Sequence, residues 1–309
     1  MSWRRRVAAA RSPASVIIRV RSGPGVNASM RRKVVVITGA TSGIGRVAAE
    51  RLGGMGARLV LIARDRGRGQ AVLDRLRTAN PGVEHSAHYA DLSSLAQAKR
   101  VAAEVAAEPR IDVLVNNAGA LFSSRHVTGD GLELTFALNH MAYFVLAHGL
   151  RERLLAGAPA RIVNVASDAH RGATLDFDDL QSAAGYGGFK AYKRSKLCNI
   201  LFTRELARRV AGTGVTANCL HPGFVASRFG DESGGLLSLG VRMAKIFAIS
   251  PEKGADTIVY LASSPDVADA NGLYFYRRRL AVPTSEAQDD AAARRLWSAT
   301  AALAGVKAD

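Results

Sequence analysis

From residue 30 onward, short apolar segments alternate with longer segments whose apolar residues recur every three or four positions. The short segments are rich in β-branched residues and apolar at nearly every position, which is typical of strands buried on both faces of a parallel sheet. Strands are predicted at residues 33–38, 58–63, 111–116, 161–166, 214–220 and 272–276, with a weaker pattern at 84–90. Helices are predicted at residues 46–56, 68–78, 95–108, 131–156, 191–210 and 253–263.

This alternation predicts an α/β fold, a single doubly wound parallel sheet of about seven strands with helices on both faces. In such sheets ligands bind at the carboxyl ends of the strands. No linker divides residues 30–309, so they are predicted to form one domain. Residues 1–29 hold six arginines and no acidic residue, and we expect a basic, disordered extension. An organelle transit peptide and a start codon placed too far upstream are the alternatives.

Composition narrows the function classes. The 309 residues carry a formal net charge of +16, which falls to +10 without the first 29. The basic residues are scattered and not interleaved with aromatic ones, so we expect no nucleic-acid partner and interpret the charge as a contribution to solubility. No apolar run approaches the roughly 18 residues of a transmembrane segment. The two cysteines lack metal-ligand spacing, and a disulfide framework is not expected. We therefore expect a cytoplasmic protein without a metal site; an organelle, or a membrane surface bound through the basic N-terminus, is the alternative.

A glycine-rich motif, TGATSGIG at residues 38–45, closes the first predicted strand and opens the first helix. Glycines at this point allow a tight turn and close approach of the backbone to a pyrophosphate, and the helix N-terminus supplies N–H groups. The motif lies between a strand and a helix, as this mechanism requires. The candidate cofactor-binding residues here are Thr38, Gly39, Ser42, Gly43, Ile44 and Gly45.

The end of the second strand indicates which dinucleotide is bound. An acidic residue there would bind the free ribose 2′-hydroxyl of NAD, whereas Arg64 offers a planar cation suited to the 2′-phosphate of NADP. Arg46 could add a second positive charge, and Asp65 could partly restore an acidic partner. We therefore expect NADP(H) as the preferred cofactor, with NAD(H) as the alternative.

Two further segments follow strands. Asp91 and Leu92 follow the third strand and are expected to contact adenine. Asn117, Ala118 and Gly119 follow the fourth, where small residues let a cofactor pass close to the strand end. Either segment alone would be a weak signal.

The candidate catalytic pair is Tyr192 and Lys196, four positions apart and so on one face of a helix. A phenol has a reference pKa of about 10, and a nearby ammonium is expected to lower that pKa toward the working range. Tyr186 and Lys190 have the same spacing, but two glycines between them disfavour a regular helix.

Other side chains complete the expected constellation. Ser167, at the end of the fifth strand, is expected to donate a hydrogen bond to the substrate oxygen. Asn139 is expected to hold water that links Lys196 to solvent. His170 and His221 are interpreted as loop residues without a catalytic role, and Cys198 as a packing residue.

Together, TGATSGIG, NNAG, the Asn139-His pair, NVAS, YKRSK and HPG occur in the order and spacing of short-chain dehydrogenases/reductases, which the chain resembles over about residues 33–280. It is most similar to the retinol dehydrogenase-like branch, through ARIVNVASDAH, LDFDDL, LFTRELARR and GTGVTANCLHPG. The resemblance implies a Rossmann-type fold and hydride transfer between a nicotinamide and an alcohol or carbonyl substrate. It also implies a catalytic core of Ser167, Tyr192 and Lys196 supported by Asn139.

The resemblance carries further expectations. It places Pro222, Gly223 and Val225 against the nicotinamide and Ser227 near a phosphate, and it implies a homodimer or homotetramer. Membrane-bound retinol dehydrogenases usually carry an apolar N-terminal anchor, whereas residues 1–29 are arginine-rich. Residues 224–250 are expected either to cover a lipophilic substrate as a lid or simply to pack on the core. The alternative functions are a light-dependent protochlorophyllide reductase-like enzyme, through KAYKRSKLCN, and a non-catalytic NADPH-binding sensor or scaffold.

Overall fold

A computed structural model describes residues 29–223 and 249–308 of the chain. Their strands form one sheet in the order β3-β2-β1-β4-β5-β6-β7-β8, in which the first seven are parallel and β8 is antiparallel to β7. The strands are β1 (Val34–Thr38), β2 (Arg58–Ala63), β3 (Ser86–Tyr89), β4 (Val113–Asn116), β5 (Ala160–Val165), β6 (Val215–Leu220), β7 (Tyr274–Tyr276) and β8 (Arg279–Leu280). The doubly wound parallel sheet predicted from the sequence is confirmed.

The near-continuous apolar strands are explained by burial on both faces of the sheet. All five residues of β1 are buried. Val34 and Val36 pack into one apolar core and Val35 and Ile37 into the other, on the opposite face. Because neighbouring side chains of a strand point to opposite faces, a strand covered on both sides is apolar at most of its positions.

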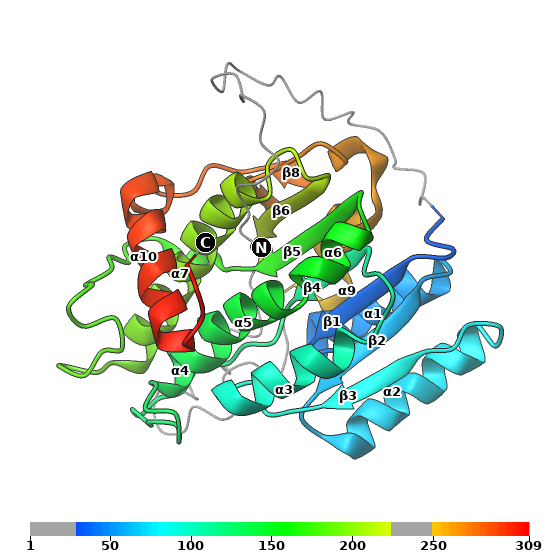
Figure 1. Ribbon diagram of the computed structural model, residues 1–309, viewed down its shortest axis with the longest axis horizontal. Helices are drawn as coiled ribbons and strands as arrows, with labels where there is room; N and C mark the ends of the chain where they lie inside the picture. The colour runs from blue at the N-terminus through cyan, green and yellow to red at the C-terminus, as the bar shows by residue number, and fades with distance from the viewer. Residues whose placement is uncertain (1–28, 224–248, 309) are drawn as a thin grey trace.

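Helices cover both faces (Figure 1). One face carries α1 (Gly43–Gly54), α2 (Arg66–Ala79) and α9 (Pro251–Ser263). The other carries α3 (Leu95–Val105), α5 (Ala142–Gly149), α6 (Arg151–Ala156), α7 (Gly188–Arg209) and α10 (Asp290–Ala304). Short helical turns complete the chain: α4 (Leu134–Phe136), η1 (Ala137–Met141), η2 (Asp168–His170), η4 (Pro265–Val267) and η5 (Glu286–Gln288).

Three elements differ from the prediction. The single helix expected at residues 131–156 is instead α4, the π-helical turn η1, α5 and α6. The first of these begins only at Leu134, because the Glu133 carboxylate accepts the N–H groups of Thr135 and Phe136 and so caps the helix. No prediction covered α10, whose alanine-rich sequence gives little apolar contrast, although Leu296 and Trp297 are buried. The two-residue β8 was also missed; it follows a turn in which Arg277 and Arg278 have positive φ.

The strand order places a topological switch point at β1, which lies between β2 and β4. The chain crosses from β1 toward β2 in one direction and toward β4 in the other, so the carboxyl ends of β1 and β4 border a crevice. Residues that follow β1, β4, β5 and β6 therefore gather along one edge of the sheet.

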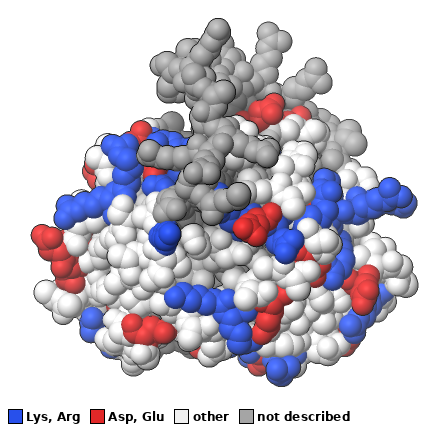
Figure 2. Space-filling model, in the orientation of Figure 1, with Lys and Arg blue, Asp and Glu red and all other residues white. Residues whose placement is uncertain are grey.

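The N-terminal extension predicted at residues 1–29 lies outside the described residues except for Ser29. The Met30 N–H donates to the Met55 carbonyl, and the Met30 side chain is buried. On the face shown in Figure 2, Lys and Arg are interspersed with Asp and Glu rather than gathered in a stripe. Arg204 and Asp290, 2.7 Å apart, form one such pair between α7 and α10.

Candidate active site

The glycine motif forms a turn against the end of β4. Gly39 has φ +66°, and a Cβ there would lie 2.9 Å from the Ala118 Cα. A Cβ on Gly45 would lie 2.3 Å from Asn117 Nδ2 and 2.4 Å from the Gly39 carbonyl oxygen. Both positions therefore require glycine, because the turn, the helix and the β4 loop approach more closely than any side chain allows.

Thr38 and Asn117 tie the turn to the β4 loop. Thr38 Oγ1 accepts hydrogen bonds from the N–H groups of Asn117 and Ala118, both at 2.9 Å. Asn117 Nδ2 donates in return to the carbonyls of Thr38 at 3.0 Å and Gly39 at 3.2 Å. The structure thus brings together two segments that the sequence analysis had singled out separately, and these hydrogen bonds fix their relative position.

The N-terminus of α1 faces this turn without a side-chain cap. The N-cap residue Ser42 makes no capping hydrogen bond, and the first turn of α1 has no acidic residue. By contrast, Asp65, Ser94 and Asp289 cap α2, α3 and α10. The first N–H groups of α1 are therefore left to an external acceptor, as a bound pyrophosphate would require.

Arg64 lies at the end of β2 and its side chain is exposed. The Asp65 carboxylate accepts the Arg68 N–H at 2.8 Å and lies 3.9 Å from the Arg68 guanidinium. Asp65 thus caps α2, which gives this acidic residue a structural role at the end of β2. Arg66 stacks on Tyr89, with its guanidinium carbon 4.7 Å from the ring centre, and adds a second cation beside Arg64.

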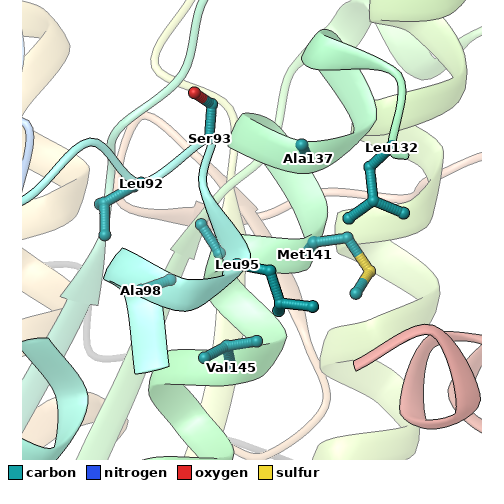
Figure 3. A pocket seen from close by; sticks show the side chains of 9 residues that line it. Leu92, Ser93, Leu95, Ala98, Leu132, Ala137, Met141 and Val145 are labelled. Atoms are coloured by element: carbon teal, nitrogen blue, oxygen red, sulfur yellow. The ribbon is translucent and has the colours of Figure 1, made fainter. Parts of the chain in front are cut away.

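Asp91 and Leu92 follow β3 as expected. Asp91 Oδ1 accepts the N–H and hydroxyl of Ser93, which fixes the loop. Leu92 is buried and borders a small apolar pocket between α3, η1 and α5, which also contains Leu132 and Met141 (Figure 3). The Asp91 carboxylate therefore fixes the conformation of the loop, and the Leu92 side chain lines the apolar pocket.

Tyr192 and Lys196 lie on α7 with side chains only 8% and 3% exposed. Lys196 Nζ is 5.5 Å from the centre of the Tyr192 ring and donates to the Val165 carbonyl at 3.2 Å. Ser167, two residues beyond that carbonyl, hydrogen bonds to the Tyr192 side chain. The serine, tyrosine and lysine that the sequence placed on two separate elements therefore meet at the end of β5.

The sequence led us to expect that Lys196 lowers the pKa of Tyr192, and this expectation is wrong for the protein without a bound cofactor. Burial raises the pKa of Tyr192 to about 12, and the hydrogen bond from Ser167 acts in the opposite direction without outweighing it. Burial likewise lowers the pKa of Lys196 to about 7. Removing both groups from water penalises their charged forms, and this effect exceeds the attraction between ammonium and phenolate that the sequence suggested. At neutral pH the phenol keeps its proton.

Asn139 lies in η1 and links this cluster to the β4 loop. Its amide accepts the Ala120 N–H and donates to the Ala120 carbonyl, both at 2.9 Å, and also donates to Ser195 Oγ at 3.0 Å. A Cβ on Gly119 would lie 3.1 Å from Asn139 Oδ1 and 3.3 Å from Lys196 Nζ. Asn139 therefore acts directly on the main chain, and Gly119 leaves room for the lysine. The water that the sequence analysis expected between Asn139 and Lys196 stays a prediction.

Tyr143 is a member of the cluster that the sequence analysis missed. It lies four residues after Asn139, its hydroxyl donates to the Val165 carbonyl at 3.4 Å, and its ring centre is 5.9 Å from Lys196 Nζ. The available signal was the spacing, since positions four apart on a helix share a face. The π-helical turn blurs that spacing in the sequence, and such turns occur often at functional sites.

The rival pair Tyr186 and Lys190 does not form a second site. Tyr186 precedes α7, and its hydroxyl donates to the Phe122 carbonyl at 3.1 Å and contacts Glu133 at 3.3 Å. The two tyrosines thus have different tasks, because one anchors the start of α7 and the other lies in the crevice.

The loop after β6 completes the described edge. Gly223 has φ +88°, and a Cβ there would lie 3.0 Å from the Ile249 side chain. Pro222 is half-buried beside it. Val225 and Ser227, also expected to contact the cofactor, lie outside the described residues, as does nearly all of the expected substrate segment 224–250. Within residues 29–223 and 249–308, no cluster of three His, Cys, Asp or Glu side chains is placed to hold a metal ion.

The fold is a doubly wound sheet with a glycine turn at its switch point and a buried Tyr–Lys pair at the same edge. These features together are typical of nicotinamide-dependent oxidoreductases. The chain belongs to the short chain dehydrogenase family, whose family model matches residues 33–234. It is thus an NAD(P)-dependent oxidoreductase that acts on CH–OH groups.

Curated relatives place it beside the retinol dehydrogenases. Human retinol dehydrogenase 13 is 38% identical over 91% of this chain and 87% of its own length. Human retinol dehydrogenase 14 is 38% identical over 90% of this chain and 88% of its own. The cattle dehydrogenase/reductase SDR family member 13 is 40% identical over 90% of this chain and 75% of its own.

Solved structures agree on the fold. An uncharacterised protein from Mycobacterium paratuberculosis superposes with a TM-score of 0.74 at 28% identity, covering 91% of this chain and 97% of that one. An NAD(P)-dependent gluconate 5-dehydrogenase from Beutenbergia cavernae, solved with bound NADP, gives 0.66 at 30% identity, covering 81% and 96%. No helix among the described residues is both long and apolar enough to cross a bilayer.

Proposed function

We propose that this enzyme reduces lipophilic aldehydes or ketones with NADPH and that Ser167, Tyr192 and Lys196 carry the reaction. The observation that carries the proposal is the burial of Tyr192 and Lys196 on one face of α7, with Ser167 hydrogen bonded to the phenol. Side chains of these types are rarely buried without a partner or a task.

Tyr192 is proposed as the proton donor. Burial raises its pKa to about 12, so the phenol is protonated at neutral pH and able to protonate a carbonyl oxygen as that oxygen gains negative charge. Ser167 Oγ lies beside the phenol and can donate a second hydrogen bond to the same oxygen. The protonated phenol is the form that carbonyl reduction requires, and the same two groups would serve the reverse reaction once the phenol has lost its proton.

Lys196 and Asn139 are proposed to support the proton donor. The buried ammonium lies 5.5 Å from the Tyr192 ring centre, close enough to stabilise negative charge on the phenol oxygen after proton transfer. Asn139 fixes the main chain at Ala120 and so keeps the adjacent Gly119, next to Lys196, in place.

The residues at the switch point fit a dinucleotide. The glycine turn offers a backbone surface without side chains, the uncapped end of α1 offers N–H donors, and Arg64 and Arg66 offer cations for a 2′-phosphate. When bound, the nicotinamide supplies the hydride. The exposed Arg64 and the neighbouring Arg66 support NADPH over NADH.

A lipophilic substrate is supported by Phe189. Its ring is 51% exposed and stacks on Tyr192 with ring centres 6.5 Å apart. An exposed phenyl ring beside the proposed proton donor suits an apolar substrate chain. The names of the relatives point the same way, since retinol is a lipophilic alcohol.

The test uses the purified full-length protein with lipophilic aldehydes, ketones and alcohols, following the absorbance of the reduced nicotinamide with both cofactors. Tyr192→Phe is expected to lower kcat by about 10²–10⁴-fold while NADPH binding is unchanged, because only the proton donor is lost.

Tyr186→Phe is the matched control, since it removes a phenol from the same region without touching the crevice, and it should keep its activity. Equal activity of Tyr192→Phe and wild type would refute the acid role. NADPH binding without turnover of any compound by the wild type would refute the enzymatic proposal and favour a sensor.

A further inference from the structure

The turn that follows β5 is held unusually firmly at Ser167. Its side-chain Oγ accepts the Ala169 N–H at 3.1 Å. Its carbonyl oxygen accepts the His170 N–H at 3.2 Å and lies 2.7 Å from Nδ1 of the His170 ring. Ser167 is therefore fixed at both its main chain and its side chain by the residues of η2.

The His170 ring makes a second contact on its other side. The ring is fully buried, and the Thr284 N–H donates to its Nε2 at 3.3 Å. Because an N–H group can only donate, Nε2 must carry a lone pair. A neutral ring then has its proton on Nδ1, which donates to the Ser167 carbonyl, so one tautomer satisfies both contacts.

The surroundings keep the ring neutral and in place. Burial lowers the pKa of His170 more strongly than any other effect, with Arg171 acting in the same direction. The bond to Ser167 and the charges of Asp168 and Glu286 act against this lowering of the pKa.

The Tyr274 ring meets the imidazole edge-on, with centres 5.3 Å apart, and His221 stacks behind Tyr274. Aromatic contacts and two hydrogen bonds thus leave the ring no other orientation that satisfies both nitrogens.

We propose that His170 is a positioning residue that orients Ser167 toward Tyr192 by tying the Ser167 carbonyl to the chain at Thr284. Without the ring, the Ser167 carbonyl loses its shortest hydrogen bond and keeps only the longer one from the His170 N–H, so the Ser167 peptide is held less firmly. A shift of that peptide also moves the Ala169 N–H that holds Ser167 Oγ, and Oγ must reach the same oxygen as the Tyr192 phenol. The proposal rests on the proposed function of Ser167 and Tyr192.

A second link between the same two segments provides a control. Arg171 donates through Nη2 to the Val282 carbonyl at 3.2 Å and through Nε to Asp168 at 2.8 Å. This link is exposed and does not touch Ser167. Loss of the Arg171 link would loosen the two segments without affecting Ser167. Loss of the His170 link would loosen the same segments and also Ser167.

Two substitutions separate the two contacts of His170. His170→Asn places an amide nitrogen near the position of Nδ1 and keeps a donor for the Ser167 carbonyl. His170→Gln places an amide oxygen near the position of Nε2 and keeps only the acceptor for the Thr284 N–H. We expect His170→Asn and Arg171→Ala to keep kcat close to wild type and His170→Gln to lower it at least about tenfold, with KM for NADPH unchanged.

Thermal unfolding of the two His170 variants is measured alongside, because each removes one buried hydrogen bond and should destabilise to a similar degree. Equal kcat for His170→Asn and His170→Gln, or a loss of activity in Arg171→Ala that matches His170→Gln, would overturn the proposal.

A measurement independent of turnover separates this proposal from the proposed function. Nitrogen-15 NMR of the histidine rings, with the His170 signal assigned by its loss in His170→Gln, reports which nitrogen carries the proton. A proton on Nδ1 supports the clamp even if the wild type turns over no substrate. A proton on Nε2 contradicts it, because that ring could neither accept from Thr284 nor donate to Ser167.

Discussion

The sharpest consequence of the geometry concerns Gly45, in the first turn of α1. Replacing it with alanine adds a Cβ that would lie 2.3 Å from Asn117 Nδ2 and 2.4 Å from the Gly39 carbonyl oxygen. Ordinary contacts of a Cβ are longer by roughly 1 Å, so both neighbours must move. One of them is main chain within the glycine turn, which has no flexible side chain to yield. The substitution therefore displaces the turn or the start of α1.

The size of the effect follows from what is lost. Overpacking of this kind costs about 1–3 kcal/mol. Displacing Asn117 Nδ2 also weakens its hydrogen bonds to the Thr38 and Gly39 carbonyls, at about 1 kcal/mol each. We expect the free energy of unfolding of Gly45→Ala to fall by about 2–4 kcal/mol. NADPH binding should weaken at least about tenfold, because the backbone that approaches the pyrophosphate is moved.

Gly54, at the other end of α1, provides the matched control. A Cβ there meets nothing within 4 Å. Gly54→Ala should therefore stabilise the helix by up to about 1 kcal/mol and leave NADPH binding unchanged. Urea unfolding gives the free energies and NADPH fluorescence the affinities. Gly45→Ala with the stability and NADPH affinity of Gly54→Ala would refute the packing argument and the placement of the pyrophosphate.

Two further results are expected. Arg64→Ala should weaken NADPH binding by about tenfold or more and leave NADH binding nearly unchanged, because a charge-assisted bond to the 2′-phosphate is lost. An unchanged ratio of the two dissociation constants would place 2′-phosphate recognition elsewhere. Burial lowers the pKa of Lys196 from 10.5 to about 7, so between these values the unfolded chain binds a proton that the folded protein lacks. The stability of the wild type should therefore rise with pH in this window relative to Lys196→Met, by up to about 1.4 kcal/mol per pH unit. Urea unfolding at several pH values measures the difference, and a constant difference would contradict the lowered pKa.

The sequence carried most of the information about the cofactor end, because that end is local. Thr38 and Gly45 are only seven positions apart, and the motif that they bound implies a tight turn between a strand and a helix wherever the rest of the chain lies. The same is true of Tyr192 and Lys196, whose spacing on a helix puts them on one face. These features follow from backbone geometry within a few residues.

The errors fell where apolar periodicity does not report the local structure. The helix expected at residues 131–156 was interrupted because Glu133 caps its start and η1 shifts its register. The alanine-rich α10 became a helix that buries Trp297 against Phe202 of α7, with ring centres 5.8 Å apart. Neither interaction leaves a periodic signal in the local sequence.

The amino-acid sequence determined which residue types occupy the ends of the strands and helices. From these residues alone the fold class, the dinucleotide-binding turn and the Tyr192–Lys196 pair could be predicted. Only the tertiary structure decided the depth at which that pair is buried, and with it the rise rather than fall of the Tyr192 pKa. It also decided that the His170 ring lies 2.7 Å from the carbonyl of Ser167, which follows β5. The physical reason is that helix and turn geometry is set within a few residues, whereas desolvation and long-range hydrogen bonds are set by every segment that packs around a group.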